Sequence, residues 1–342
     1  MIDLLITVLT IVVGLGVFGA VLLGAYWLVS HFPGRWRDRG FVWVFAGPAI
    51  VMLIIGLMIP AIRTIFFSFR SDDPVNPTFV GLKWYKDIFQ ARDNRLTVLN
   101  NVTWVVLGTL GTTMFALTVA RFADGIKGEK TAKSLIFIPT CVSLVGSGLI
   151  WKFVYADNAR QGLLNAITKA IPGLPKSWGG EGTNNWVLNQ GYAGLNPPKG
   201  WPGFNTFLLI VIFIWTSAGI ATVIFSAAIK GVPESLVEAA KVDGATNKQI
   251  FYKVTLPYIR PTIITVMTLT TIAALKAFDI VAAVTGGRFG TSLLANRFLD
   301  EIFLQQRDGH GSAFAVLIFV LVIPFVVISR RAQKKAEEMI GG

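Results

Sequence analysis

A short polar segment, residues 234–253, lies between two apolar stretches, and its side chains can contact a partner outside a membrane. Its charged residues are Glu234, Glu238, Lys241, Asp243, Lys248 and Lys253. A charged side chain is costly in hydrocarbon, so this segment must lie beyond the lipid core. No catalytic constellation accompanies these charges, which favours recognition of another molecule over bond chemistry.

Local signals predict two short helices joined by a tight turn in this segment. Pro233 suits the first turn of a helix, because its missing N–H needs no partner there. Asp243-Gly244 stops that helix, since glycine adopts a positive φ without steric cost. Thr246 and Gln249 stand three residues apart, as in a capping box that starts a second helix. We therefore expect a rigid helix–turn–helix at the membrane face that serves as a docking site for a soluble partner. This segment is called the polar hairpin below.

Long apolar stretches flank the polar hairpin on both sides. The chain has 342 residues, of which 53% are hydrophobic and 15% charged, whereas soluble domains carry about 25% charged residues. A spanning helix needs roughly 20 mostly apolar residues. Segments of this kind occupy residues 4–29, 41–68, 98–121, 132–155, 204–229, 262–284 and 312–330. Backbone groups in lipid must bond internally, so we predict an all-α membrane protein with about seven transmembrane helices.

The spans divide the chain into two expected parts. Residues 1–40 form an extra N-terminal transmembrane helix and a basic cytoplasmic hinge, and residues 41–342 form a six-span core. The first helix lacks the basic start of a cleavable signal peptide. Within the core, residues 156–203 are rich in Pro and Gly and predict a long irregular external loop.

The distribution of basic residues predicts the orientation. With the polar hairpin in the cytoplasm, the inside segments hold 16 Lys and Arg in 71 residues, and the outside segments hold 12 in 104. The denser side is inside, as the positive-inside rule requires. The net charge of +12 therefore suits the ends of spans near anionic lipid. No basic stripe with interleaved aromatics indicates a nucleic-acid partner.

Several kinds of chemistry lack their motifs in this sequence. Gly290-Thr291-Ser292 lacks the lysine of a phosphate-binding P-loop, so we expect no ATP site on this chain. No G-x-S-x-G nucleophile elbow occurs. Cys141 is the single cysteine, and His31 and His310 lie far apart in the sequence, so neither a disulfide framework nor a metal site is expected.

The polar hairpin resembles the EAA loop of binding-protein-dependent ABC importer permeases. The matching residues are Glu238, Ala239, Ala240, Asp243, Gly244, Ala245, Phe251, Leu256, Pro257 and Pro261. The resemblance implies that residues 230–261 form a cytoplasmic coupling loop that contacts an ATPase subunit. A lone E-A-A run would carry no weight, but a match over 24 residues between two late spans is specific.

Other segments resemble the carbohydrate branch of this family, which includes maltose and α-glucoside permeases. They are Ala46-Gly47-Pro48-Ala49, Thr285-Gly286-Gly287 after Phe278-Asp279, and residues 309–313. The family's six-span core with an added N-terminal helix also fits the pattern of spans. One departure is that the maltose-type permease carries a large external domain where this chain has only residues 69–97.

The resemblance implies a transmembrane subunit of the bacterial or archaeal cytoplasmic membrane that is not itself an enzyme. The implied partners are a second homologous permease subunit, two ATP-binding subunits that hold ATP and Mg²⁺, an extracytoplasmic sugar-binding protein and membrane lipid. No cofactor is expected on this chain. The cargo expected from the carbohydrate branch is a di- or oligosaccharide such as an α-glucoside, maltose or trehalose.

Polar residues within two late spans are candidates for the substrate path. Lys276 and Asp279 stand three residues apart, and on one helical face they could pair beside Phe278. The resemblance places substrate-lining residues in this span and in the preceding one, at Trp215, Thr216, Ser217 and Gly219. Aromatic rings and hydroxyls suit a sugar, because the rings stack on its C–H faces while the hydroxyls bond its hydroxyls.

Simpler interpretations of these residues and of the function stay open. Lys276 and Asp279 can form a purely structural pair, and Trp215 can fill a gap between helices. An ABC permease for a non-sugar solute would use the same loop. A secondary transporter driven by an ion gradient would not need that loop, and a membrane-embedded enzyme would need an assembled catalytic group.

Overall fold

The computed structural model describes residues 2–31, 34–156, 162–170 and 202–341. Most of the expected external loop, residues 156–203, therefore lies outside the described residues. Contacts divide the chain into two units, Met1–Phe66 and Phe67–Gly342. The expected division at residue 40 stays a prediction. Apart from one isolated bridge between Arg70 and Phe79, the regular structure in the described ranges is helical.

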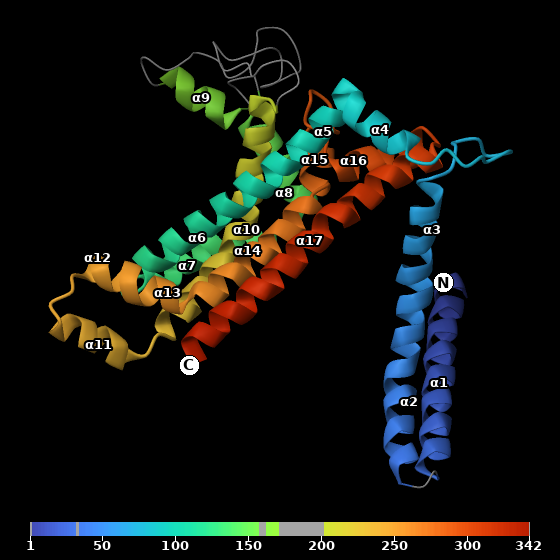
Figure 1. Ribbon diagram of the computed structural model, residues 1–342, viewed down its shortest axis with the longest axis horizontal. Helices are drawn as coiled ribbons and strands as arrows, with labels where there is room; N and C mark the ends of the chain where they lie inside the picture. Colours follow the sequence, from blue (N-terminus) through green and yellow to red (C-terminus); the bar gives the residue numbers. More distant parts are fainter. Residues whose placement is uncertain (1, 32–33, 157–161, 171–201, 342) are drawn as a thin grey trace. The chain divides into compact units, whose positions relative to one another are not determined.

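The first unit is a helical hairpin (Figure 1). Helix α1 (Ile2–Ser30) packs against α2 (Arg35–Leu53), and the rings of Tyr26 and Phe41 lie 5.3 Å apart between their centroids. A π-helical turn, η1 (Ile54–Met58), joins α2 to α3 (Ile59–Phe67). The rod from Gly40 to Phe67 is long and apolar enough to cross a membrane.

Pro60 lies inside this rod, and the rod passes it without a break. A proline ring clashes with the carbonyl of the residue four positions earlier, which here is Gly56 in η1. The wider π turn moves that carbonyl out of the way. The same device precedes Pro257, where η4 (Phe251–Thr255) is also π-helical.

Within its described residues, the second unit contains three continuous rods that can span a membrane. The first runs from α5 (Arg92–Thr103) through η2 (Trp104–Gly108) to α6 (Thr109–Ala123). The others are α10 (Phe204–Lys230) and α17 (Asp308–Gly341). With the rod of the first unit, two bent helix pairs and a shorter apolar helix, Val12–Trp27, the described residues confirm the predicted all-α membrane class.

The span expected at residues 132–155 is not continuous. It consists of α7 (Glu129–Phe137), the 3₁₀ turn η3 (Ile138–Cys141) and α8 (Leu144–Val154), with a bend of 103° between the two halves. Pro139 lies in η3 and offers no N–H to a continuing helix. Ser143 then starts α8 by accepting a hydrogen bond from Gly146 N at 3.0 Å.

The span expected at residues 262–284 also differs. Helices α12 (Asn247–Ile250) and α13 (Leu256–Tyr258) bend by 67° into α14 (Arg260–Leu275), which ends before Lys276. A separate helix, α15 (Asp279–Val284), follows. The expectation that Lys276 and Asp279 share one helical face is therefore wrong, because the chain leaves the helix between them.

Helix α10 lies at the centre of the second unit. It packs against α6, α14, α8 and η3, and α14 packs in turn against α17 (Figure 1). The main core joins Leu209, Ile212 and Phe213 of α10 to Trp104 of η2, whose ring centroid is 5.5 Å from that of Phe213. Van der Waals packing of these side chains holds the helices together, since such packing drives helix association in lipid.

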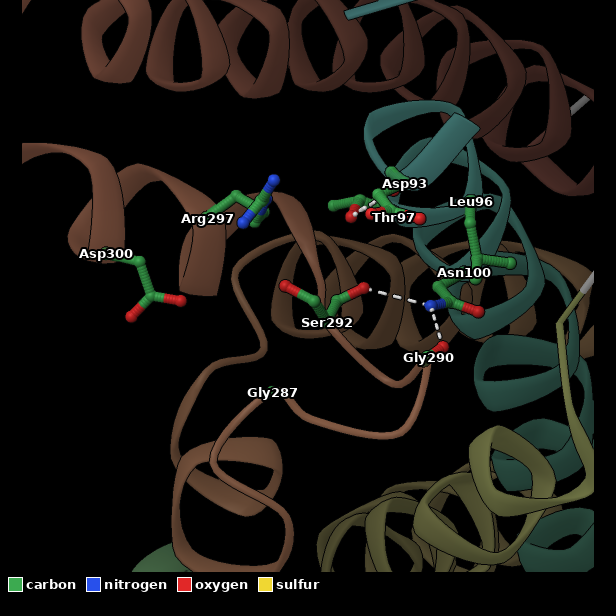
Figure 2. A pocket seen from close by; sticks show the side chains of 9 residues that line it. All are labelled: Asp93, Leu96, Thr97, Asn100, Gly287, Gly290, Ser292, Arg297 and Asp300. Atoms are coloured by element: carbon green, nitrogen blue, oxygen red, sulfur yellow. Dashed lines mark hydrogen bonds between the residues drawn. The ribbon is translucent and has the colours of Figure 1, made fainter. Parts of the chain in front are cut away.

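One end of the unit carries α11 (Glu234–Val242) and α12, and the other carries short helices (Figure 1). The short helices are α4 (Lys83–Gln90), α15, α16 (Leu294–Leu299) and η5 (Asp300–Leu304); α9 (Leu163–Ala170) contacts α8. Buried Asn100 holds this end together, because its side-chain amide donates to the carbonyls of Gly290 at 2.7 Å and Ser292 at 3.0 Å (Figure 2). Thr206 of α10 donates to Asn100 Oδ1 at 3.2 Å.

We predict that Asn100→Ala destabilises this end of the protein. The change leaves two loop carbonyls without their donor, and a buried unsatisfied polar group costs about 1–3 kcal/mol. The melting temperature of the purified protein in detergent, followed by tryptophan fluorescence, should fall. Asn76→Ala, at an exposed position, is the control and should change stability by less than about 0.5 kcal/mol. Equal melting temperatures for both variants would contradict the assignment.

Candidate functional site

The polar hairpin has the predicted helix–turn–helix form. Helix α11 begins after Pro233, which is the N-cap residue and not the first helical residue. Thr246 caps α12: its hydroxyl accepts from Gln249 N at 3.3 Å, and Gln249 Oε1 accepts from Thr246 N at 2.8 Å. The predicted capping box is thus confirmed.

The turn between the two helices is closed by backbone hydrogen bonds. Gly244 has φ +79°, the left-handed region that favours glycine. Ala245 N donates to Ala240 O at 3.0 Å, and Gly244 N donates to Lys241 O at 3.0 Å. This pair of bonds is a Schellman motif, which satisfies the last carbonyls of α11 and sets the angle at which the chain leaves it.

Helix α11 is open to a partner, because it has no buried residue. Among the motif residues, Glu238, Ala239, Asp243, Gly244 and Pro257 are exposed, and Ala240, Ala245, Phe251 and Leu256 are half-buried. Val242 is 88% exposed although it is apolar. The surface of α11 is therefore accessible to a partner along its length.

Phe251 connects the polar hairpin to the spans. The guanidinium carbon of Arg121, near the end of α6, lies 4.9 Å from the centroid of the Phe251 ring. Ile250 and Thr255 on either side are buried. Sequence reasoning missed Arg121, because no local signal pairs residues 130 positions apart.

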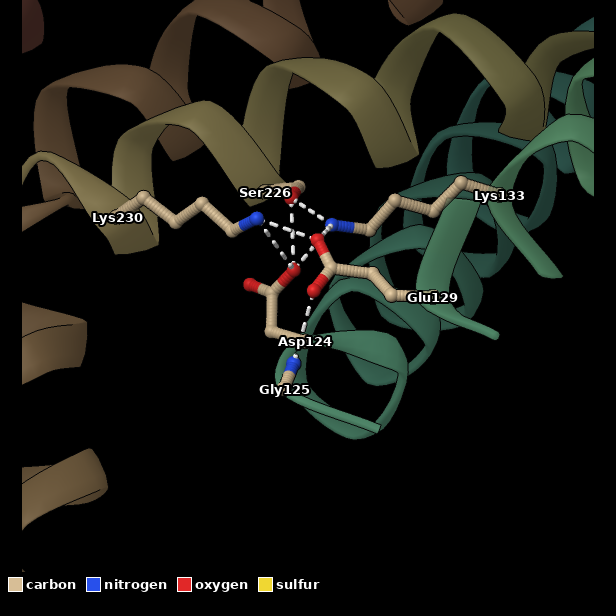
Figure 3. A network of polar contacts seen from close by, with 6 residues as sticks. All are labelled: Asp124, Gly125, Glu129, Lys133, Ser226 and Lys230. Atoms are coloured by element: carbon tan, nitrogen blue, oxygen red, sulfur yellow. Dashed lines mark hydrogen bonds and ion pairs between the residues drawn. The ribbon is translucent and has the colours of Figure 1, made fainter. Parts of the chain in front are cut away.

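A second connection joins the α6–α7 turn to the end of α10. Its members, called the ionic cluster, are Asp124, Glu129, Lys133, Ser226 and Lys230 (Figure 3). Lys133 Nζ lies 2.7 Å from Glu129 Oε1, and Ser226 Oγ donates to Asp124 Oδ1 at 2.8 Å. Lys133 also contacts Asp124 and Ser226, and Lys230 contacts Glu129. The cluster therefore holds α10 four residues before α11 begins.

A cavity of about 390 Å³ lies at the break between η3 and α8. Its polar lining residues are Thr140, Ser143, Thr216, Ser217 and Thr270, and its apolar ones include Val142, Ile220 and Leu269. Thr216 and Ser217 stand at the middle of α10. Irregular backbone at membrane depth is tolerated where it is buried in protein or lines a water-filled space. The break in the span therefore borders this cavity, which is called the break cavity below.

Two of the four residues predicted from α10, Thr216 and Ser217, line the break cavity. Trp215 instead packs edge-on against Trp151, with centroids 5.6 Å apart. Gly219 lies against the broken span, where an added Cβ would come within 2.3 Å of Thr140 Oγ1. Only glycine permits this close approach between α10 and η3.

The three residues predicted from the next span are not brought to the break cavity. Lys276 is exposed at the end of α14, and Asp279 starts α15. Within the described residues no ion pair joins the two. Phe278 is half-buried, and its carbonyl accepts from Asn296 Nδ2 at 3.5 Å. A role for these three in substrate transfer stays a prediction.

A further polar group lies at the opposite end from the polar hairpin. The ring nitrogens of buried His310 lie 3.1 Å from Glu301 Oε2 and 3.1 Å from Asp87 Oδ2. Arg307 contacts Glu301 and Asp72, each at 3.1 Å. Burial of Glu301 raises the pKa of its carboxyl, but the contact with His310 and the nearby arginines outweigh burial and hold that pKa below its usual value. Across the described ranges, no group of three or more His, Cys, Asp or Glu side chains is arranged to hold a metal ion.

Three curated relatives of this chain are described as permease proteins. The chain is 37% identical over 303 residues to the osmoprotective compounds uptake permease protein GgtC of Synechocystis sp., covering 86% of this chain and 100% of the relative. It is 38% identical to the alpha-glucoside transport system permease protein AglF of Rhizobium meliloti, over 83% of this chain and 80% of the relative. The trehalose/maltose transport system permease protein MalF of Thermococcus litoralis is 26% identical, over 88% of this chain and 95% of the relative.

The fold is similar to that of a solved permease. A chain from the crystal structure of a bacterial alginate ABC transporter, in complex with an alginate pentasaccharide-bound periplasmic protein, superposes with a TM-score of 0.70 at 19% identity. The match covers 88% of this chain and 97% of that chain. The family model for the binding-protein-dependent transport system inner membrane component matches residues 1–335. The chain is therefore a multi-pass permease of the cytoplasmic membrane that belongs to the binding-protein-dependent ABC importer family and is not the ATPase subunit.

Proposed function

We propose that this permease carries a sugar, a di- or oligosaccharide such as an α-glucoside, maltose or trehalose, inward from an extracytoplasmic binding protein. The observation that carries the proposal is the break cavity, which combines hydroxyl and apolar groups halfway along α10. Similarity to permeases described for α-glucosides and for trehalose/maltose supports the same class of cargo.

The chemistry of the break cavity suits a sugar. The Ser217 hydroxyl has no hydrogen-bond partner within the described part of the chain, so it is available to a ligand. Ser143 Oγ accepts from Gly146 N and keeps its own proton to donate. Ile220 and Leu269 supply apolar surface for the C–H faces of a sugar ring. The cavity volume of about 390 Å³ falls in the range of about 300–1,000 Å³ typical of small-molecule sites.

One alternative cargo has direct support. The relative from Synechocystis sp. is described as an uptake permease for osmoprotective compounds. A small polyhydroxylated or zwitterionic osmolyte would use the same hydroxyl groups and would need less apolar surface. Competition between a disaccharide and such osmolytes for uptake distinguishes the two cargoes.

The proposed complex contains this chain, a second homologous permease, two ATP-binding subunits and the binding protein. In it, α11 is the coupling helix: Glu238 offers a charge to the ATPase, Ala239 permits close approach, and the turn at Asp243-Gly244 keeps the helix rigid. Two connections carry the movement of α11 to the spans: the cation–π contact of Arg121 with Phe251, and the ionic cluster at Lys230. Because the ionic cluster also holds α7, both connections bias the two halves of the broken span between inward-open and outward-open states.

We predict that Gly244→Val abolishes ATP-dependent uptake while the chain stays inserted in the membrane. A β-branched residue at φ +79° costs about 1–3 kcal/mol and opens the turn between the two helices. Gly244→Asn is the matched control, because Asn tolerates the left-handed region, and it should keep most of the uptake. The measurement is disaccharide uptake into proteoliposomes that hold the full complex. Wild-type uptake with Val at this position would refute the coupling role.

For the cargo site, we predict that Ser217→Val raises the apparent KM for the sugar by about twofold to tenfold, the worth of one hydrogen bond. ATPase copurification should not change, since Ser217 lies far along α10 from α11. Ser134→Val, on the exposed face of α7, is the control. Transport kinetics that are equal in Ser217→Val and in Ser134→Val would remove the break cavity from the substrate path.

A further inference from the structure

A groove of about 430 Å³ separates the end of α6 from the second half of the polar hairpin. Met114, Leu117 and Phe122 of α6 form one wall, and Phe251, Tyr252 and Leu256 form the other. Met114 is 67% exposed and Phe122 73% exposed, so these side chains face outward from the bundle. The groove begins on the apolar part of α6 and ends at the polar hairpin, where the hydrocarbon must end.

Two cations stand at the polar end of the groove. Arg121 and Lys248 belong to its lining, which contains no acidic side chain. Neither forms an ion pair within the described ranges of the chain, whereas Lys133 and Lys230 at the same end are paired with the carboxylates of the ionic cluster. Arg121 lies against the Phe251 ring, a cation–π contact that leaves its N–H groups available to a ligand.

The combination selects a ligand with an anionic head and an apolar tail. Free phosphate would satisfy Arg121 and Lys248 but would leave the apolar walls uncovered. A neutral lipid would cover the walls but would leave two cations uncompensated. We propose that the groove binds one anionic phospholipid of the cytoplasmic leaflet, with its phosphate between Arg121 and Lys248 and an acyl chain along Met114 and Leu117. The choice of the cytoplasmic leaflet rests on the proposed function, which places the polar hairpin in the cytoplasm.

The position of this site gives the lipid a mechanical role. Arg121 lies on a span and Lys248 on α12, so one phosphate joins the two elements that the polar hairpin must move together. A bound lipid adds an ionic contact beside the cation–π contact of Arg121 with Phe251. Coupling of ATP hydrolysis to uptake should therefore be tighter in bilayers that contain anionic lipid.

The experiment measures lipid retention by the intact importer complex and does not require transport to work. The complex is reconstituted into phosphatidylcholine bilayers with or without phosphatidylglycerol, and retained lipid is counted by native mass spectrometry after gentle release. The double variant Arg121→Gln with Lys248→Gln should lower phosphatidylglycerol retention by about thirtyfold. Each basic residue near an anionic lipid contributes roughly fivefold in affinity, and the two contributions multiply. Lys127→Gln with Lys130→Gln is the charge-matched control, at exposed positions of the same end, and should retain phosphatidylglycerol like the unmodified complex.

A second variant tests the apolar wall without a change of charge. Leu117→Trp fills the groove and should also displace the lipid, while the melting temperature reports whether the fold survives. Equal retention in the charge variant and its control overturns the proposal. Loss of the second permease from the charge variant, with lipid retention unchanged, also overturns it and assigns the groove to a segment of that subunit. Because retention is read without uptake, its failure is distinguishable from failure of the proposed sugar transport.

Discussion

Hydrocarbon cannot hydrogen-bond to a polypeptide, and the architecture of this permease depends on that constraint. Every stretch exposed to lipid must satisfy its own backbone groups, which is why the described ranges are almost entirely helical. The sharper of the two bends found in the described spans, between η3 and α8, is packed against α10 and borders a cavity. The break is therefore stable only because other helices and the cavity surround it, and the same break supplies the polar groups that a cargo needs.

The polar hairpin and the broken span are physically connected in this account. Lys230, at the end of α10, contacts Glu129 at the start of α7, and α7 leads directly to the break. Phe251 lies on Arg121 at the end of α6, which packs along α10. Under the proposed function, a shift of α11 moves the ends of α6, α7 and α10. At Gly219, α10 lies so close to η3 that no side chain can be added, and we propose that the shift passes to η3 at this contact.

Local chemistry made much of this structure predictable. The capping box at Thr246, the turn at Gly244 and the exposure of Glu238 all follow from residue types within a few positions of each other. The apolar runs identified the membrane class. What could not be predicted depends on distant residues: the full 103° angle of the break near Pro139, the separation of Lys276 from Asp279, and the ionic cluster, whose members come from α7, α10 and the turn after α6. A proline alone does not distinguish a break from a smooth passage, since the rod through Pro60 stays continuous because of the π turn before it.

The most direct test of the connection uses the single native cysteine, Cys141, which is exposed at the end of η3 between the cavity residues Thr140 and Val142. In the reconstituted complex, the rate at which a water-soluble thiol reagent labels Cys141 can be followed by peptide mass spectrometry, with and without ATP. We expect clearly different labelling rates in the two nucleotide states of the unmodified complex, and no difference in the Gly244→Val variant. Equal rates in both nucleotide states of the unmodified complex would contradict the claim that α11 controls access to the break cavity.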